Sequence, residues 1–503
     1  MLLAKPSLTN NSFMSFYTQN LIANDILAKE RGTIRKTFGS FFSAAVCFPN
    51  SYHVGASNLG THFLYEQINL RPDFLAERFF TDLNPPISLE SRQPLNAFNI
   101  ILFTVPFEMD FANCLDMLHR AGIPIFRKER LPHHPLICAG GTAIAMNPLP
   151  MGDFMDAMVC GDGEILLSCL LDAVIEERGF KAGVLERLKN DGRFFIPTDD
   201  DAAIIPPKAA CWDALHHPLS SVFLTPNTEF ADTCLIEISR GCPFNCAFCY
   251  IGHNQNPFRY YGFERIREEF EKNRGRTNRF GLISSAVTAH PELERICGYA
   301  LREKLEISFS SIRADCVPDI LLELLLQSGQ KTLTLAPETG SDSFRRKIEK
   351  GIVNEQILDA VRRASAMGFT NLRLYFMLGL PDETLSEIEA SVELIHSAQK
   401  ILLADGRKRG RVGEIVATVS FFVPKPGTPL ADVPQMDISE LKRRQQSFRS
   451  ALKSLSHVRY QPADPYEAKA QMILSNQGRE AAELLMRKWS GNLSWKAALR
   501  HSG

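Results

Sequence analysis

Three cysteines, Cys242, Cys246 and Cys249, lie close together in the segment Ser-Arg-Gly-Cys-Pro-Phe-Asn-Cys-Ala-Phe-Cys-Tyr. Their CxxxCxxC spacing gathers three thiolates into one short loop, which favours an iron–sulfur cluster. A [4Fe-4S] cluster normally takes four cysteine thiolates, so three leave one iron open to a substrate or cofactor. Structural zinc takes four nitrogen or sulfur ligands, and no second cysteine pair follows. The spacing therefore predicts a catalytic cluster rather than buried or zinc-binding cysteines.

This cysteine loop needs a strand to carry it. Residues 234–239 form a short apolar run of the length expected for a buried strand, so the loop follows the carboxyl end of a strand. Parallel α/β barrels carry their active sites at that end. Further strands are expected near 279–284, 306–312, 331–336, 371–376 and 415–422, separated by helices near 263–273, 291–303, 317–327, 354–367 and 383–398. Six such units are too few for a closed eightfold barrel, so we expect a partial barrel.

A similar alternating pattern precedes the barrel. Strands are expected at 41–47, 77–80, 99–105, 136–139 and 157–160, with helices at 58–69, 111–121 and 164–178. Alternation of this kind predicts an α/β fold whose parallel sheet has helices on both faces. We therefore divide the chain into an N-terminal arm (1–37), a Rossmann-like domain (38–196), a proline-rich connector (197–233), the partial barrel (234–436) and a mainly helical C-terminal region (437–503).

The cysteine loop and its context resemble the radical S-adenosylmethionine (SAM) superfamily. In that superfamily the open iron binds SAM, which is split reductively to a 5'-deoxyadenosyl radical with an electron from a donor such as flavodoxin or ferredoxin. The resemblance implies that Phe248 and Tyr250 pack the adenine and that strand ends supply further SAM contacts, from Ser284, Ser310, Arg313, Glu338 and Arg346. Ser284 departs from the Gly-Gly-Glu that many members carry. The two aromatic residues could equally be core packing, and Glu338 could be a helix cap.

The N-terminal domain resembles the cobalamin-binding domain that precedes the barrel in one large class of radical SAM enzymes. The resemblance to an incompletely characterised subfamily of that class covers almost the whole chain. Rossmann-like sheets bind ligands beyond the carboxyl ends of their strands. The residues at those ends that we expect to contact cobalamin are Tyr52, Gly55, Asn58, Gly140, Gly141, Gly161 and Gly163. Related domains use Asp-x-His-x-x-Gly to bind cobalt, whereas this chain has Asn50-x-Tyr52-x-x-Gly55. We therefore expect no histidine beneath the cobalt. The alternative is a degenerate domain that only packs on the barrel.

Composition limits the classes of partner. The chain has 503 residues, 45% of them hydrophobic, and a net charge of −1, so nothing indicates broad nucleic-acid binding. No apolar run reaches the roughly 18 to 20 residues that span a bilayer. Twelve cysteines, scattered apart from the loop, suit a reducing compartment, and we expect a cytoplasmic protein. The basic run Lys442-Arg443-Arg444 is typical of a solvated helix face. The substrate, a small molecule or a peptide, is not indicated.

These features together predict a radical SAM enzyme with one [4Fe-4S] cluster. With cobalamin beside it, the expected reaction is C-methylation, in which a substrate radical at an unactivated carbon takes a methyl group from cobalamin. Members of the same class also catalyse radical rearrangements and cyclisations, so this alternative stays open. Two others are a methylthiotransferase, which Cys47-Phe-Pro-Asn50 superficially fits, and a non-catalytic cobalamin or iron–sulfur protein acting as a carrier or sensor.

Overall fold

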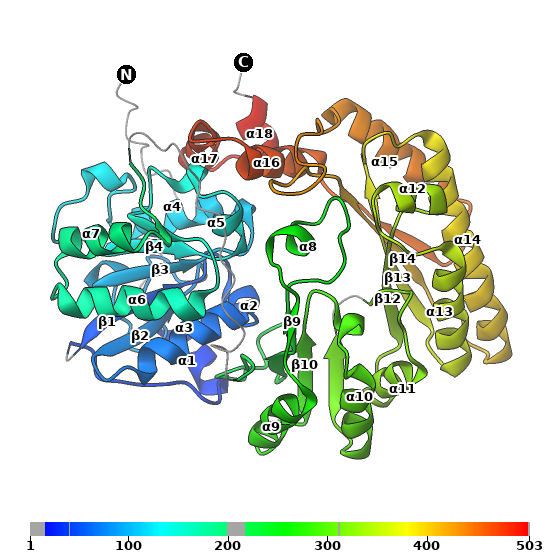
Figure 1. Ribbon diagram of the computed structural model, residues 1–503, viewed down its shortest axis with the longest axis horizontal. Helices are drawn as coiled ribbons and strands as arrows, with labels where there is room; N and C mark the ends of the chain where they lie inside the picture. The colour runs from blue at the N-terminus through cyan, green and yellow to red at the C-terminus, as the bar shows by residue number, and fades with distance from the viewer. Residues whose placement is uncertain (1–15, 40, 199–216, 310–311, 501–503) are drawn as a thin grey trace. The chain divides into compact units, whose positions relative to one another are not determined.

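The computed structural model describes residues 16–39, 41–198, 217–309 and 312–500 (Figure 1). The chain divides into two compact units. Unit 1 contains residues 1–232 and 473–503, and unit 2 contains residues 233–472. In the described segments no helix combines the length and apolar character needed to cross a membrane.

Unit 1 is built on one six-stranded sheet with the order β2-β1-β3-β4-β5-β6. Five strands are parallel and β6 is antiparallel to β5. The strands are β1 (Phe42–Cys47), β2 (Phe74–Phe79), β3 (Ile100–Thr104), β4 (Leu136–Gly140), β5 (Ala157–Val159) and β6 (Phe194–Phe195). Every residue of β2 and β3 is buried, as expected for a parallel sheet covered on both faces. The order 2-1-3-4-5 is that of doubly wound folds, which bind ligands where the strand order reverses, between β1 and β3.

Helices of unit 1 come from both ends of the chain (Figure 1). They are α1 (Phe16–Lys29), α2 (Tyr52–Gly55), α3 (Leu59–Leu70), α4 (Phe111–Arg120), α5 (Thr142–Met146), α6 (Gly163–Glu176), α7 (Lys181–Asp191), α17 (Ala481–Ser490) and α18 (Trp495–Arg500). The five predicted strands and three predicted helices are present with shifts of a few residues. The helix α1 lies in the stretch treated as an arm, because Ala23, Ile26 and Leu27 bury an apolar face.

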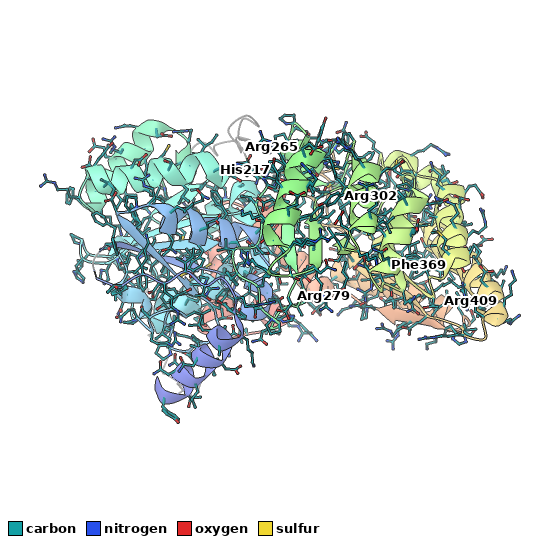
Figure 2. All side chains as sticks on the ribbon, turned by 90° about the horizontal axis from the view of Figure 1, so that it is seen from below. His217, Arg265, Arg279, Arg302, Phe369 and Arg409 are labelled. Atoms are coloured by element: carbon teal, nitrogen blue, oxygen red, sulfur yellow. The ribbon has the colours of Figure 1, made fainter. Side chains whose placement is uncertain are left out.

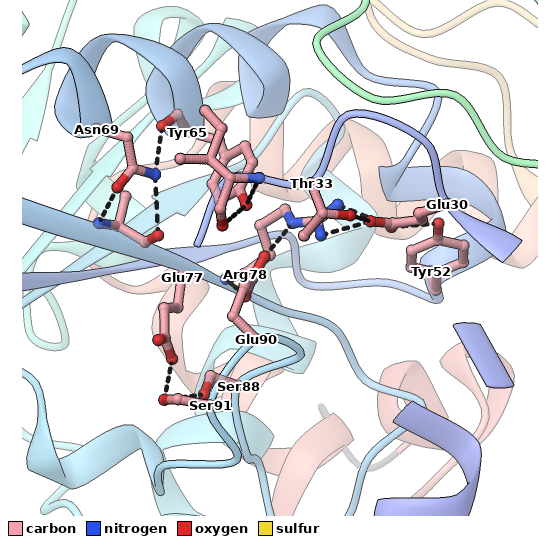
Figure 3. A network of polar contacts seen from close by, with 12 residues as sticks. Glu30, Thr33, Tyr52, Tyr65, Asn69, Glu77, Arg78, Ser88, Glu90 and Ser91 are labelled. Atoms are coloured by element: carbon pink, nitrogen blue, oxygen red, sulfur yellow. Dashed lines mark hydrogen bonds and ion pairs between the residues drawn. The ribbon is translucent and has the colours of Figure 1, made fainter. Parts of the chain in front are cut away.

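A buried ion-pair network links α1 to the sheet (Figure 3). Arg78 on β2 is fully buried, with its Nη2 2.7 Å from Glu30 Oε2 and its Nε 2.6 Å from Glu90 Oε1. Its guanidinium also lies 4.0 Å from the ring centre of Phe223. Two carboxylates therefore balance one buried cation, which is the condition for a charge to be tolerated away from water. Phe223 belongs to the predicted connector, so the described part of that segment, from residue 217, packs as part of unit 1.

Unit 2 contains seven parallel strands in two sheets, ordered β11-β10-β7 and β12-β13-β14-β15. The strands are β7 (Cys234–Glu237), β10 (Arg279–Ile283), β11 (Glu306–Phe309), β12 (Thr332–Glu338), β13 (Asn371–Leu378), β14 (Ile415–Phe421) and β15 (Val458–Gln461). A bridge between Ile312 and Leu335 joins the two sheets, so the result is an open, partial barrel. A short antiparallel pair, β8 (Ser239–Arg240) and β9 (Arg259–Tyr260), follows β7.

Helices alternate with these strands, as the sequence predicts. They are α8 (Tyr250–Asn254), α9 (Phe263–Asn273), α10 (Leu293–Arg302), α11 (Asp319–Gln327), α12 (Asp342–Lys347), α13 (Asn354–Met367), α14 (Leu385–Lys408), α15 (Ile438–Leu452) and α16 (Pro465–Asn476). Figure 2 labels Arg279, the first residue of β10, and Phe369, just before β13; both mark the amino ends of strands. The cysteine loop lies at the opposite, carboxyl end.

The C-terminal region departs from the sequence expectation in two ways. The strand β15 adds a seventh strand inside a region expected to be mainly helical. Residues from Ile473 onward belong to unit 1 rather than to the barrel. The side-chain amide of Asn147 donates to the carbonyl oxygens of Leu474 and Gln477, and the Ser475 hydroxyl donates to buried Glu108 at 2.6 Å. These bonds attach the last helices to the first sheet.

Candidate active site

The cysteine loop is shaped by two close backbone approaches. Gly241, directly before the first cysteine, has φ +77°, and a Cβ there would collide with the carbonyl oxygen of Gln255. A Cβ on Gly252 in α8 would collide with the carbonyl oxygen of Phe244. Because only glycine accepts both the positive φ and the close contact, the loop is held tightly against α8.

The three thiols occupy this loop at different depths. Cys246 is buried, whereas Cys242 and Cys249 are half-buried. Burial raises the pKa of both Cys242 and Cys246, and the neighbouring Cys249 raises it further in each case, so Cys249 lies near both of the other thiols. The loop is closed by a hydrogen bond of 2.9 Å from the Cys249 N–H to the Cys246 carbonyl oxygen.

The donor set of this loop suits an iron–sulfur cluster. It offers three thiols within eight residues, which are the ligands that such clusters take. Among the described residues, no group of three Cys, His, Asp or Glu side chains has the arrangement needed to bind a metal ion. Rotation of the cysteine side chains would therefore accompany cluster binding, while the backbone bonds keep the loop in place.

Two cations lie beside Cys246. Arg313 places its Nη1 4.0 Å from the Cys246 Sγ and its guanidinium 3.7 Å from the ring centre of Phe244. It also pairs with Asp315 at 2.8 Å. Lys350 is the larger electrostatic influence on Cys246 and, like Arg313, lowers the pKa of that thiol against the effect of burial. The positive charges thus favour the thiolate form, which is the form that binds metal.

Glu338 pairs with Lys350 at the end of β12. The Lys350 Nζ donates to Glu338 Oε1 at 2.9 Å, and both side chains are largely buried. Burial opposes the charged ammonium, but Glu338 and Cys246 together outweigh this cost and the pKa of Lys350 is raised. The residue Glu338 has φ +65°, and the β12–β13 register shifts between Leu335 and Glu338. The irregularity between these two residues therefore turns the carboxylate out of the regular strand pattern, as bulges beside active sites often do.

The segment that carries Lys350 is fixed to the cysteine loop. The Ala247 N–H donates to the Ile348 carbonyl oxygen at 3.0 Å, and Arg313 Nη2 donates to the Lys350 carbonyl oxygen at 2.9 Å. Arg345 supports the same segment from beneath, because its buried guanidinium bonds Thr339 O and Ile352 O. Arg346, which the sequence analysis selects, is exposed. Lys350, which lies beside Cys246 together with Arg313, is a basic residue that the sequence analysis missed.

The other barrel residues selected from the sequence differ in burial and in their contacts. Phe248 is half-buried and packs on the small core of Phe344, Ile348, Leu380 and Phe422, with the Lys350 Nζ 5.9 Å from its ring centre. Tyr250 is buried at the start of α8. The Ser284 hydroxyl lies 2.6 Å from that of Ser239, which joins the ends of β10 and β8. Ser310 lies outside the described residues.

In unit 1, the edge between β1 and β3 carries a buried carboxyl group. Asp110 accepts hydrogen bonds from the side-chain amides of Asn50, at 2.9 Å, and Asn113, at 3.3 Å. Burial raises the pKa of Asp110 to about 6, although these two bonds pull it down. Sequence reasoning did not select Asp110, because Glu108-Met-Asp110 has no motif of its own. The fold brings it to Asn50 at the strand-order reversal.

The residues selected as cobalamin contacts have structural roles here. Tyr52 is buried and its hydroxyl donates to Glu30 at 2.6 Å, so it points into the unit 1 network (Figure 3). Asn58 caps α3 through Thr61 N. Gly55 makes room for the rings of Phe48 and Phe80.

Four glycines lie at the carboxyl ends of β4 and β5: Gly140 ends β4, and the other three follow the two strands. Gly141 and Gly161 have φ of +109° and +144°, Gly140 lies against Val159, and Gly163 begins α6. These glycines bring main chain without side chains to the ends of both strands.

Comparison with known proteins gives matches over both units. The model described as "Radical SAM proteins, N-terminal" matches residues 60–197, and the model described as "Radical SAM superfamily" matches residues 236–395. An uncharacterized protein from Methanocaldococcus jannaschii is 27% identical over 424 residues, covering 83% of this chain and 85% of that protein. An uncharacterized methyltransferase from Pyrococcus horikoshii is 28% identical over 279 residues, covering 53% of this chain and 58% of that protein.

Solved structures extend the comparison of the fold. The radical SAM methyltransferase TsrM from Kitasatospora setae, solved with cobalamin and a [4Fe-4S] cluster, matches with a TM-score of 0.55 at 12% identity, covering 92% of this chain and 99% of that one. At this identity the match shows a shared fold.

A further relative by sequence is a putative methylthiotransferase from Methanocaldococcus jannaschii. It is 23% identical over 303 residues, covering 57% of this chain and 62% of that protein.

Proposed function

Because this chain belongs to the radical SAM superfamily, we propose that it cleaves SAM reductively at a [4Fe-4S] cluster held by Cys242, Cys246 and Cys249. The cluster, when bound, supplies the electron that splits the sulfonium of SAM into methionine and a 5'-deoxyadenosyl radical. A small reductant of the flavodoxin or ferredoxin kind delivers that electron. The observation that carries the proposal is the thiol loop itself, which lies at the carboxyl end of a barrel strand with two cations beside Cys246.

The neighbouring residues are suited to hold SAM. The ammonium of Lys350 can bind the carboxylate of SAM, and the carboxylate of Glu338 can accept hydrogen bonds from the ribose hydroxyls of SAM. Phe248 presents a half-buried ring beside this pair, which would limit access of water to a reactive carbon radical. The Glu338 backbone at φ +65° aims the carboxylate, so its position is set before any ligand binds.

We further propose that unit 1 binds cobalamin at the carboxyl edge of β1, β3, β4 and β5. The strand order places the reversal point beside Asn50 and Asp110, and the glycine turns after β4 and β5 leave backbone accessible to a large planar ligand. Tyr52 is turned away into the Glu30 network, and His53 has its Nδ1 3.2 Å from the Asn227 carbonyl oxygen. These positions support a cobalamin without a histidine ligand beneath cobalt.

With both cofactors, the proposed reaction is methylation of an unactivated carbon, after a substrate hydrogen atom is removed by the 5'-deoxyadenosyl radical. The relative named as a methyltransferase supports this class, and the relative named as a methylthiotransferase keeps sulfur transfer as the second candidate. The products distinguish the candidates, since rearrangement consumes no methyl group and a carrier or sensor cleaves no SAM.

The test is anaerobic reconstitution with iron, sulfide and cobalamin, followed by mass spectrometry of SAM products. Wild-type protein should form 5'-deoxyadenosine, and Cys246→Ser should lose both the product and the cluster absorption. The matched control is Cys169→Ser, a half-buried cysteine of unit 1 outside the loop. Product that persists in Cys246→Ser would overturn the cluster assignment.

Cobalamin is tested separately by the absorption of the purified complex. A stoichiometric corrinoid spectrum that is unchanged in His53→Ala, with no nitrogen splitting in the EPR spectrum of the reduced cobalt, is the expected result. A fully loaded cluster in a protein that retains no corrinoid would remove the second cofactor from the proposal.

A further inference from the structure

The seventh strand leaves an open edge on the barrel sheet. β15 pairs only with β14, as the last strand in the order β12-β13-β14-β15. The Ile415 N–H donates to the His457 carbonyl oxygen at 2.9 Å, so the backbone groups of His457 face β14. Because successive residues of a strand direct their backbone groups to opposite sides, the N–H and C=O groups of Val458 and Tyr460 face away from β14. Across the described segments, no hydrogen bond to the backbone N–H or C=O of these two residues is present. They form the open edge.

A groove runs along this strand beside α15. Its volume is about 740 Å³, which is within the range of ligand sites. One wall is a stripe of α15 at helical spacing, and the other is β15 with the following proline; the lining residues are Lys442, Gln445, Gln446, Arg449, Val458, Arg459, Tyr460 and Pro462. The stripe lies next to the buried face of α15 formed by Leu441, Phe448 and Leu452, so it is held rigidly in place.

The charge of this groove has one sign. It is lined by Lys442, Arg449 and Arg459 and by no Asp or Glu. Arg459 has an exposed partner, Glu414, at 3.2 Å, and Lys442 donates to the hydroxyl of Tyr466 at 3.0 Å. Within the described residues Arg449 has no carboxylate partner. An excess of positive charge along this groove, in a chain whose net charge is −1, is a local feature and not the result of overall composition.

We propose that this groove binds an extended acidic peptide segment of a partner protein, whose backbone pairs with β15 and whose carboxylates meet Lys442, Arg449 and Arg459. Strand addition satisfies the open N–H and C=O groups of Val458 and Tyr460, and the cations select acidic side chains. A second copy of β15 would bring like charges together, which opposes pairing. Nucleic acid would satisfy the charges but cannot pair with the strand edge as a peptide backbone does. The proposal is independent of the cofactors of the active site.

The test uses the full-length protein and fluorescein-labelled peptides of ten residues in which glutamate and valine alternate. Fluorescence anisotropy should give saturable binding that weakens as salt is added, because the ion pairs are exposed. An otherwise identical peptide with methylated backbone nitrogens at alternate positions, which cannot pair with a strand, should not bind. On hydrogen exchange, the acidic peptide should slow exchange of the segment 458–460.

Matched variants on one helix separate the groove from the general surface. Lys442→Gln with Arg449→Gln should weaken binding about fivefold, the loss expected for two exposed ion pairs. Arg443→Gln, an exposed cation of α15 that does not line the groove, should leave the affinity unchanged. The far-ultraviolet circular dichroism of all variants shows whether α15 is intact.

Three outcomes would overturn the proposal. One is the absence of binding up to about 1 mM peptide. Another is equal binding of the methylated peptide, which would remove the strand pairing. The third is a single-stranded oligonucleotide that binds more tightly than the acidic peptide and loses affinity in the double variant, which would assign the groove to nucleic acid.

Discussion

Arg313 allows the electrostatic role of the active-site cations to be measured. The Arg313→Gln variant removes the positive charge whose Nη1 lies 4.0 Å from the Cys246 Sγ. At that distance a unit charge is worth about 4 kcal/mol with an effective dielectric constant of 20. An added electron spreads over the cluster, and Asp315 offsets part of the cation, so the expected effect is about 1–2 kcal/mol. For one electron this lowers the midpoint potential of the cluster by about 40–90 mV.

The assay is a redox titration of the reconstituted cluster followed by EPR, which needs neither SAM nor substrate. Arg313→Gln together with Asp315→Asn should have a midpoint potential between those of the single variant and the wild type, because the stranded carboxylate is removed as well. The control is Arg346→Gln, an exposed cation of α12, which should leave the potential unchanged. Equal potentials in Arg313→Gln and wild type, with equal iron content, would refute the argument.

Three further predictions concern the two units. Arg78→Ala should lower the free energy of unfolding of unit 1 by about 3–5 kcal/mol in urea, because two carboxylates lose their buried partner. Arg71→Ala, at a pair that is only partly buried, should cost less than about 1 kcal/mol, and equal losses would contradict this. The native state holds the proton of Asp110 up to about pH 6, whereas the unfolded state releases it near pH 4, so this group makes stability fall as pH rises through that window. Asp110→Asn should therefore gain about 1–2 kcal/mol at pH 7 and flatten the pH 4–6 profile, and an unchanged profile would show that Asp110 is not buried. Gly241→Ala should lower the number of cluster iron atoms bound per chain, because the added Cβ would collide with the carbonyl oxygen of Gln255. Gly275→Ala, with open space around it, should bind as much iron as the wild type. Equal iron content in the two variants would mean that the cysteine loop can move to accommodate the Cβ.

Much of the fold could be predicted from local periodicity. The predicted helix 354–367 coincides with α13, and the apolar runs that gave β1, β3 and β4 are strands because they are buried on both faces. The strand β15 was not predicted, because Val-Arg-Tyr-Gln is short and half polar and forms a strand through its pairing with β14. Helix α2 is absent from the predicted helices, because its four residues carry no periodicity.

The parts of the candidate site whose residues are adjacent in sequence could be predicted. The parts whose residues are brought together only by folding could not. CxxxCxxC is contiguous, so spacing alone identified the loop. Lys350 stands twelve residues after Glu338, and only the turn held by Arg345 brings it back to the carboxylate. Tyr52 occupies the position that a motif would give to a cobalt ligand, but its hydroxyl donates a hydrogen bond to Glu30, directly after α1, which keeps the side chain buried. Such long-range partners leave no local pattern.

The assignment of residues 473–503 to unit 1 affects the order in which the chain can fold during synthesis. All seven barrel strands emerge from the ribosome before Ser475, which donates to buried Glu108, and before Gln477, whose carbonyl accepts from Asn147. The barrel can therefore complete its sheet while the first unit still waits for its final helices. A fragment ending at residue 232 would leave Glu108 and Asn147 without these partners, so limited proteolysis should find it less protected than the same residues in the full chain.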